Sequence, residues 1–237
     1  MKPVDYRKFR LSGLKTPAFS HLLLLLYWPL FGLIFYSIEI LPDRFPNLFP
    51  VHYHPVYWAL LDEKIPFSEW FFIPYIYWFV FIGWFIVYSI FFDIPAFKKY
   101  MYFVIASYSM TLLIYFLFPT EQNLRKAAFE QGNLLEKWVG MFYAFDTNTN
   151  VCPSLHVTGS LAVAFAAGDS KRYRTVGWRI FFMTSAVVIS LSTVLIKQHS
   201  IVDVFVSLAL CGIIYPFIFI DAGPFKKLFH KKRSVSC

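Results

Sequence analysis

Two histidines and an aspartate have the residue types and the spacing that phosphoryl transfer needs. His199 and Asp203 are four positions apart, so on a helix their side chains lie on one face. A carboxylate that accepts a hydrogen bond from one ring nitrogen fixes the imidazole tautomer and leaves the other nitrogen free to attack. His156 in its protonated form can supply a proton to a leaving alkoxide. We therefore expect His199 to be a nucleophile, Asp203 to orient it and His156 to be a general acid.

The residues around His156 and a loop arginine are expected to bind the phosphate. Pro153 is favoured at the first position of a helix, so we expect a helix to begin there. Amides at a helix N-terminus attract anions, and those near Ser154 and His156 would face a phosphate group. Arg125 has a planar guanidinium that matches phosphate oxygens. Each residue alone also has an ordinary structural interpretation, and only their joint placement favours a site.

No metal and no cofactor are expected. The sequence offers no carboxylate cluster suited to magnesium near these residues. His52 and His54 lack a third ligand at a matching spacing. They stand among aromatic residues, so we interpret their loop as an aromatic belt at a membrane interface.

Membrane-spanning helices must position these residues. The chain has 237 residues, of which 58% are hydrophobic and 22% aromatic. A hydrocarbon core about 30 Å thick is crossed by about 20 apolar residues in a helix, and the apolar runs here are continuous rather than alternating. We predict an all-α polytopic membrane protein with six transmembrane helices, over residues 19–41, 70–92, 100–118, 153–168, 180–196 and 201–220.

The net charge of +8 is distributed as in a membrane protein and not as in a nucleic-acid-binding protein. Sixteen of the 22 Lys and Arg residues lie in the N-terminal segment, the second and fourth connections and the C-terminal tail. Basic residues that alternate by loop in this way mark the cytoplasmic side. We therefore expect both termini in the cytoplasm, and Arg125, His156, His199 and Asp203 together on the outer side.

One membrane domain is expected over 1–237, with a catalytic core over 119–220. Within it, apolar residues recur at helical spacing over 134–145, which predicts a helix lying in the outer interface. That helix would either control the access of a lipid or simply rest on the surface. The first span is too long for a cleaved signal peptide, and no small-residue cleavage site follows it. We expect a cell membrane, that of a bacterium, with no obligate protein partner.

Two sequence motifs carry a resemblance to a known family. Pro153-Ser154-Leu155-His156 resembles the Pro-Ser-x-His motif of the type-2 phosphatidic acid phosphatase superfamily. Ser192, His199 and Asp203 resemble the family's third motif, in which Ser-Arg is followed after five residues by His and after three more by Asp. Thr193 stands where that motif has Arg. The resemblance covers roughly residues 119–220, and the six-span topology is similar.

The resemblance implies metal-independent chemistry in two steps. His199 attacks phosphorus to form a phosphohistidine while His156 protonates the leaving group, and water or an alcohol then resolves the intermediate. Of the first motif, Lys-x6-Arg-Pro, only Arg125 is present. Lys126 and Lys197 are therefore the candidates for the remaining phosphate-binding cations.

Three functions remain open. The first is a phosphatase that hydrolyses a lipid phosphate, such as phosphatidic acid or a polyprenyl phosphate or pyrophosphate. The second is a phosphotransferase that moves a phospho-headgroup to a lipid alcohol, because Pro119-Thr120 before Arg125 and Lys197-Gln198-His199 resemble the inositol-phosphorylceramide and sphingomyelin synthase-like branch. The third is a lipid-binding or transport protein without catalysis.

Overall fold

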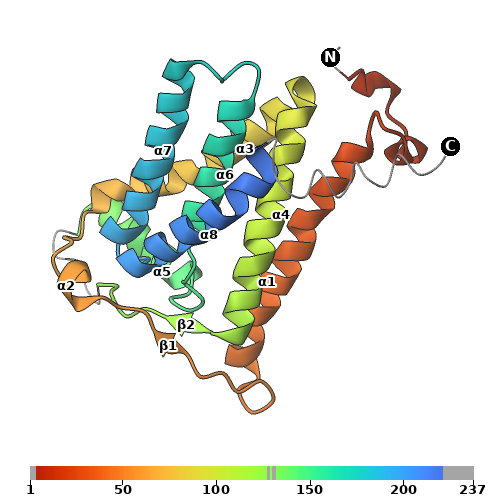
Figure 1. Ribbon diagram of the computed structural model, residues 1–237. Coiled ribbons are helices and arrows are strands. Elements are labelled where there is room, and N and C mark those ends of the chain that lie inside the picture. The colour runs from red at the N-terminus through yellow and green to blue at the C-terminus, as the bar shows by residue number, and fades with distance from the viewer. Residues whose placement is uncertain (1–3, 127–128, 130–131, 221–237) are drawn as a thin grey trace.

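A computed structural model describes residues 4–126, 129 and 132–220. The cations of the C-terminal tail, on which part of the predicted topology depends, lie outside these residues. The described chain is mostly helical (Figure 1). Its α-helices are α1 (Tyr27–Arg44), α2 (Ala59–Asp62), α3 (Phe72–Phe92), α4 (Ile94–Leu117), α5 (Leu134–Phe145), α6 (Leu155–Asp169), α7 (Val176–Leu195) and α8 (Ile201–Phe219).

Shorter elements complete the fold. Segments of 3₁₀ helix cover Tyr6–Lys8, Leu11–Lys15, Ser20–Leu26 and Glu69–Phe71. The third of these leads directly into α1, and the fourth leads into α3. Two short strands, β1 (His54–Pro55) and β2 (Thr120–Glu121), form a parallel pair in which His54 lies opposite Thr120.

Five helical stretches in the described residues are long and apolar enough to cross a membrane, as expected of a multi-pass membrane protein. They are Ser20–Pro42, Glu69–Phe92, Ile94–Leu117, Val176–Leu195 and Ile201–Phe219. Each overlaps a predicted span. The fourth predicted span corresponds to α6, which has 15 residues. A helix of that length is about 22 Å long, so it is shorter than a typical hydrocarbon core.

Helix α6 is the centre of the bundle. It contacts α3, α4, α7 and α8, and most of its residues are buried. Its sequence is rich in Gly, Ser and Ala, which let neighbouring helices approach closely. Gly159 shows how closely, because a Cβ atom there would lie 2.5 Å from Oη of Tyr108 on α4.

Two predicted boundaries are wrong. The third span is predicted to begin at residue 100, but α4 already begins at Ile94, because Pro95 lies in its first turn, where a missing amide proton costs nothing. Pro153 was expected at the first position of its helix. The helix instead begins at Leu155, and Ser154 takes the N-cap position, for which serine is a preferred residue.

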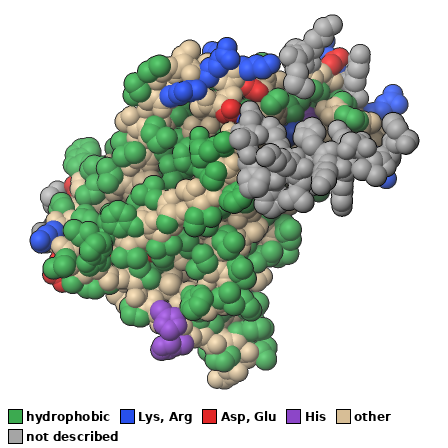
Figure 2. All heavy atoms as spheres, in the orientation of Figure 1, with side chains coloured by type: hydrophobic (Ala, Val, Ile, Leu, Met, Phe, Trp, Pro, Cys, Tyr) green, Lys and Arg blue, Asp and Glu red, His purple; other side chains and the backbone are tan. Residues whose placement is uncertain are grey.

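The two ends of the bundle differ in charge. Lys and Arg side chains gather over the end at which α6 and α7 are joined (Figure 2). Asp93 ties the α3–α4 turn to this connection by accepting hydrogen bonds from Ser170 Oγ and the Lys171 amide, each over 3.0 Å. Lys99 forms an ion pair with Asp169 over 2.5 Å. The predicted site residues lie toward the other end.

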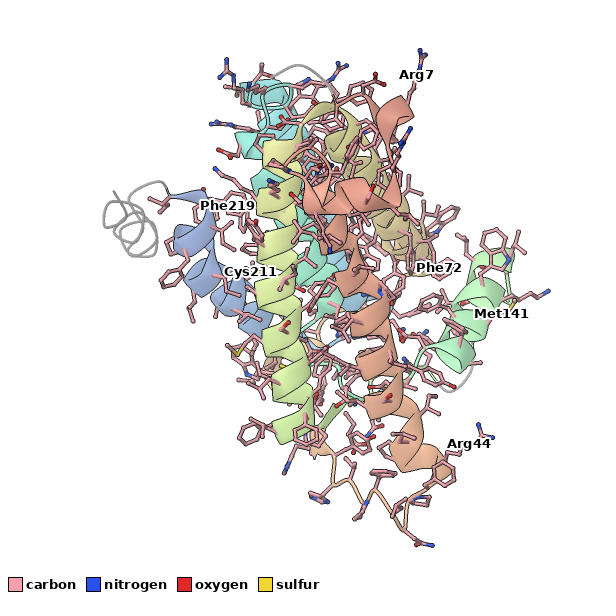
Figure 3. All side chains as sticks on the ribbon, turned by 90° about the vertical axis from the view of Figure 1, so that its right-hand side faces the viewer. Arg7, Arg44, Phe72, Met141, Cys211 and Phe219 are labelled. Carbon is pink, nitrogen blue, oxygen red and sulfur yellow. The ribbon has the colours of Figure 1, made fainter. Side chains whose placement is uncertain are left out.

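Helix α5 occupies the range in which a helix was predicted, and it has two apolar sides. Val139 and Phe142 face the bundle, where Phe142 meets Tyr75 with ring centroids 5.1 Å apart. Trp138 and Met141 are exposed, and Met141 lies on the side of α5 away from the other helices (Figure 3). Its position in a membrane interface remains a prediction.

Candidate functional site

His199 and Asp203 form a hydrogen-bonded pair at the start of α8. Nδ1 of His199 lies 2.9 Å from Oδ2 of Asp203. The same carboxylate oxygen accepts the backbone amide of Ser200 over 3.1 Å, and Ser200 caps the helix in return. Asp203 is 0% exposed and His199 is 9% exposed. Because Asp203 occupies Nδ1, the free ring nitrogen of His199 is Nε2.

His156 lies in the first turn of α6 between two aromatic rings of α3. Its ring stacks on Tyr75 at a centroid distance of 4.3 Å and lies 4.3 Å from the ring of Trp78. Its centroid is 6.1 Å from that of His199. Nε2 of His156 is buried and has no hydrogen-bond partner among the described residues. The structure therefore brings both predicted histidines to one place.

The turn that carries His199 is held from several sides. Nε2 of Gln122 donates to the carbonyl oxygens of Lys197 and Gln198 over 3.1 and 3.0 Å, and Oη of Tyr143 donates to the carbonyl of Ile196. Lys197 has a φ of 57°, a left-handed conformation that is costly for a residue with a Cβ atom. These contacts fix the backbone that precedes His199.

Asp62 on α2 holds the start of α8. Its Oδ2 accepts Oγ of Ser200 over 2.6 Å, and its Oδ1 accepts the amide of Ile201 over 2.9 Å. Lys197 reinforces this connection, because its ammonium donates to the carbonyls of Asp62 and Ile65 over 2.9 and 2.6 Å. The segment between α1 and α3 thus positions the start of α8.

The loop before α6 is held by α1 and α4. Glu39 on α1 is 5% exposed and accepts three hydrogen bonds, from Asn150 Nδ2 over 2.6 Å, Thr149 Oγ1 over 2.8 Å and Thr147 Oγ1 over 2.5 Å. Oη of Tyr115 on α4 donates to the carbonyl of Pro153 over 2.6 Å. Both contacts fix the backbone that leads to His156.

The four predicted phosphate-binding residues have the following contacts. Ser154 is 0% exposed, its amide donates to Ser207 Oγ over 2.8 Å, and its own Oγ has no partner among the described residues. The guanidinium of Arg125 donates to the carbonyls of residues 143, 146 and 147 over 3.0, 2.9 and 2.5 Å. Nζ of Lys126 lies 4.8 Å above the ring of Phe67. Lys197 donates to the carbonyls of Asp62 and Ile65. Three of the four residues, Arg125, Lys126 and Lys197, therefore contact other parts of the protein.

Asp146 and Gln198 are additional residues of the site that the sequence interpretation missed. Gln198 Nε2 donates to Oδ2 of Asp146 over 2.8 Å. Burial raises the pKa of Asp146, and the nearby charges of His199 and Arg125 oppose that shift. The sequence did indicate both residues as candidates for the site. Gln198 adjoins His199, and Asp146 begins the polar run before Pro153.

No group of three or more His, Cys, Asp or Glu that could hold a metal ion is found among the residues that the structure describes. The comparisons with known proteins add no assignment, because no family model, curated protein or solved structure matches the chain.

Proposed function

We propose that this chain is an integral membrane phosphatase that hydrolyses a lipid phosphate at the outer face of a cell membrane through a phosphohistidine on His199. In this proposal α6 crosses the membrane as the fourth of six spans, and both termini are cytoplasmic. The observation that carries the proposal is the buried His199–Asp203 pair, 2.9 Å apart, with the ring of His156 centred 6.1 Å from that of His199.

The chemistry divides into two balanced steps. Nε2 of His199 attacks phosphorus, so that a P–N bond forms as the bond to the lipid oxygen breaks, and His156 gives that oxygen a proton. Water then attacks phosphorus, the P–N bond breaks, and the proton of the water returns to His156. Asp203 keeps the attacking nitrogen unprotonated by binding the other ring nitrogen.

One hydroxyl and three cations are the groups proposed to bind the phosphate. Ser154 Oγ is buried without a partner in the described residues, so it is available to a phosphate oxygen. Arg125, Lys126 and Lys197 would have to exchange a present contact for a phosphate oxygen. A substrate that carries less negative charge needs fewer of these cations to leave their present contacts.

Release of inorganic phosphate tests the proposal. Purified protein in detergent is given phosphatidic acid or a polyprenyl phosphate in mixed micelles, with and without a chelator. Wild-type protein is expected to release phosphate under both conditions. His199→Ala should reduce release to background, His156→Ala should reduce it about 10²–10⁴-fold, and the exposed His52→Ala serves as the control. Unchanged release by His199→Ala would rule out the assignment, and no release from any lipid would favour a lipid-binding or transport protein.

Transfer to a lipid alcohol is the second candidate function. Oε1 of Gln198, which adjoins His199 and is buried with no partner among the described residues, favours it, because a lipid alcohol with a second hydroxyl can donate to this atom and hydrolysis by water needs no such acceptor.

A further inference from the structure

A buried polar cluster adjoins the nucleophile and takes no part in the His199–Asp203 pair. Gln198 is 2% exposed, and its Nε2 lies 2.8 Å from Oδ2 of Asp146 and 3.5 Å from Oη of Tyr75. Tyr75 is 0% exposed and donates to the same oxygen of Asp146 over 3.4 Å. We call Gln198, Asp146 and Tyr75 the Asp146 cluster.

The cluster determines which end of the Gln198 amide is free. An ionised carboxylate only accepts hydrogen bonds, so the amide nitrogen must face Asp146. Oε1 of Gln198 is the remaining polar atom, and it is buried with no partner among the described residues. A buried acceptor without a donor destabilises a protein. A ligand that donates a hydrogen bond to Oε1 would remove that penalty.

The position of the cluster relates this free acceptor to the reaction. Gln198 directly precedes His199, and the ring of Tyr75 stacks on His156 at 4.3 Å. The cluster therefore adjoins both histidines. An anionic group does not suit this acceptor, because it has no proton to donate to Oε1, whereas a neutral hydroxyl can donate to it.

One side of the cluster is apolar. Tyr75 packs in one apolar group with Phe72 and Val139, and its ring meets that of Phe142 on α5. Hydrocarbon chains suit such a surface better than a sugar or a nucleotide does. A lipid alcohol fits both the apolar surroundings and the free acceptor.

We propose that the Asp146 cluster is an acceptor subsite for a lipid alcohol that carries a second hydrogen-bond donor next to its reacting hydroxyl. The inference rests on the proposed function, because it requires the phosphohistidine. The second donor binds Oε1 of Gln198. The reacting hydroxyl oxygen then attacks phosphorus, its bond to phosphorus forms as the P–N bond to His199 breaks, and its proton passes to His156. Gln198 is a specificity residue, and Asp146 positions it.

Two matched alcohols test the subsite. The donor is phosphatidic acid labelled with ³²P in its phosphate, and the acceptors are 1-oleoylglycerol and its 2-O-methyl ether, which lacks the second donor. Label in new lipid and label in inorganic phosphate are measured together. Wild-type protein should transfer to 1-oleoylglycerol at least about tenfold more efficiently than to the ether, the value of about one hydrogen bond. Equal transfer to both alcohols overturns the subsite.

A variant assigns the preference to Gln198. Gln198→Met has a similar length and no acceptor, so the roughly tenfold preference for 1-oleoylglycerol should fall to about one. A preference that persists in this variant contradicts the role of Oε1, and if the variant does not fold, the wild-type comparison decides alone. Phosphate release with no transfer to either alcohol refutes the subsite but leaves the phosphatase proposal standing. Failure to release or transfer label from any lipid phosphate refutes the proposed function itself.

Discussion

Nδ2 of Asn150 lies 2.6 Å from Oε1 of Glu39, and this bond joins α1 to the loop that leads into His156. Thr147 and Thr149 donate to the other carboxylate oxygen of Glu39. The first transmembrane helix therefore helps to position a residue more than one hundred positions further along the chain.

Glu39→Gln should destabilise the protein. A glutamine offers one acceptor oxygen in place of two, and its amide nitrogen would face a donor. Loss of a buried hydrogen bond of this kind costs about 1–3 kcal/mol, and each kcal/mol lowers the melting temperature of a chain of this size by roughly 2–4 °C. Thermal unfolding in detergent measures the change. Ser37→Ala is the control, because that hydroxyl of α1 donates to the carbonyl of Leu33 in its own helix. Equal melting temperatures for the two variants would contradict the role of Glu39.

Gly159→Ala should disturb both the bundle and the wall of the site. The added Cβ would lie 2.5 Å from Oη of Tyr108 and 3.2 Å from Cζ2 of Trp78, which contacts His156. We expect a loss of about 1–3 kcal/mol from overpacking. Gly212→Ala is a matched control, since nothing lies within 4 Å of a Cβ at that helical position, and alanine favours a helix by about 1 kcal/mol over glycine.

A second substitution shows whether the Tyr108 hydroxyl causes the effect. Tyr108→Phe in the Gly159→Ala background removes the closest atom, although it also removes the bond to the carbonyl of Leu155. Partial recovery of the melting temperature relative to Gly159→Ala is expected. If Gly159→Ala is as stable as Gly212→Ala, the close approach of α4 and α6 is not as described.

The pH dependence of stability tests the environment of Asp146. Burial raises its pKa above the ordinary value of 3.8, so between these two values the folded protein holds a proton that the unfolded chain has released. The free energy of unfolding therefore falls as pH rises through this window, by at most about 1.4 kcal/mol per pH unit. Asp146→Asn removes this dependence of the free energy of unfolding on pH. The melting temperature of the variant minus that of the wild-type protein should therefore rise with pH and then level off. Asp169→Asn controls for the loss of one charge at the opposite end. A relative melting temperature that falls with pH would show that Arg125 and His199 outweigh burial.

Much of the fold could be predicted, because the length of an apolar run determines whether it can span a membrane. The five long helices lie close to their predicted ranges. The pairing of His199 with Asp203 could also be predicted, since spacing within one helix is local information. The start of α6 after Ser154 also has a local signal, because serine is a preferred N-cap residue, but the contact of Tyr115 with the carbonyl of Pro153 comes from another helix and could not be predicted.

The supports of the site were harder to predict, because they come from distant segments. Asp62 accepts a hydrogen bond from Ser200, which is 138 positions away, and no local pattern relates the two. Arg125 has the residue type of a phosphate ligand, yet three carbonyl groups at the end of α5 and directly after it occupy its guanidinium. Glu39 did carry a signal. It is an ionisable residue within a predicted span, which is the same feature that draws attention to His156.

Covalent capture of the intermediate is the most direct test of the central claim that His199 is the nucleophile. Protein is mixed with phosphatidic acid labelled with ³²P in its phosphate and quenched with alkaline denaturant, and the labelled peptide is mapped by mass spectrometry. We predict label on His199 in wild-type protein and in His52→Asn, and none in His199→Asn. Label that persists in folded His199→Asn, or that maps to another residue in wild-type protein, would contradict the account.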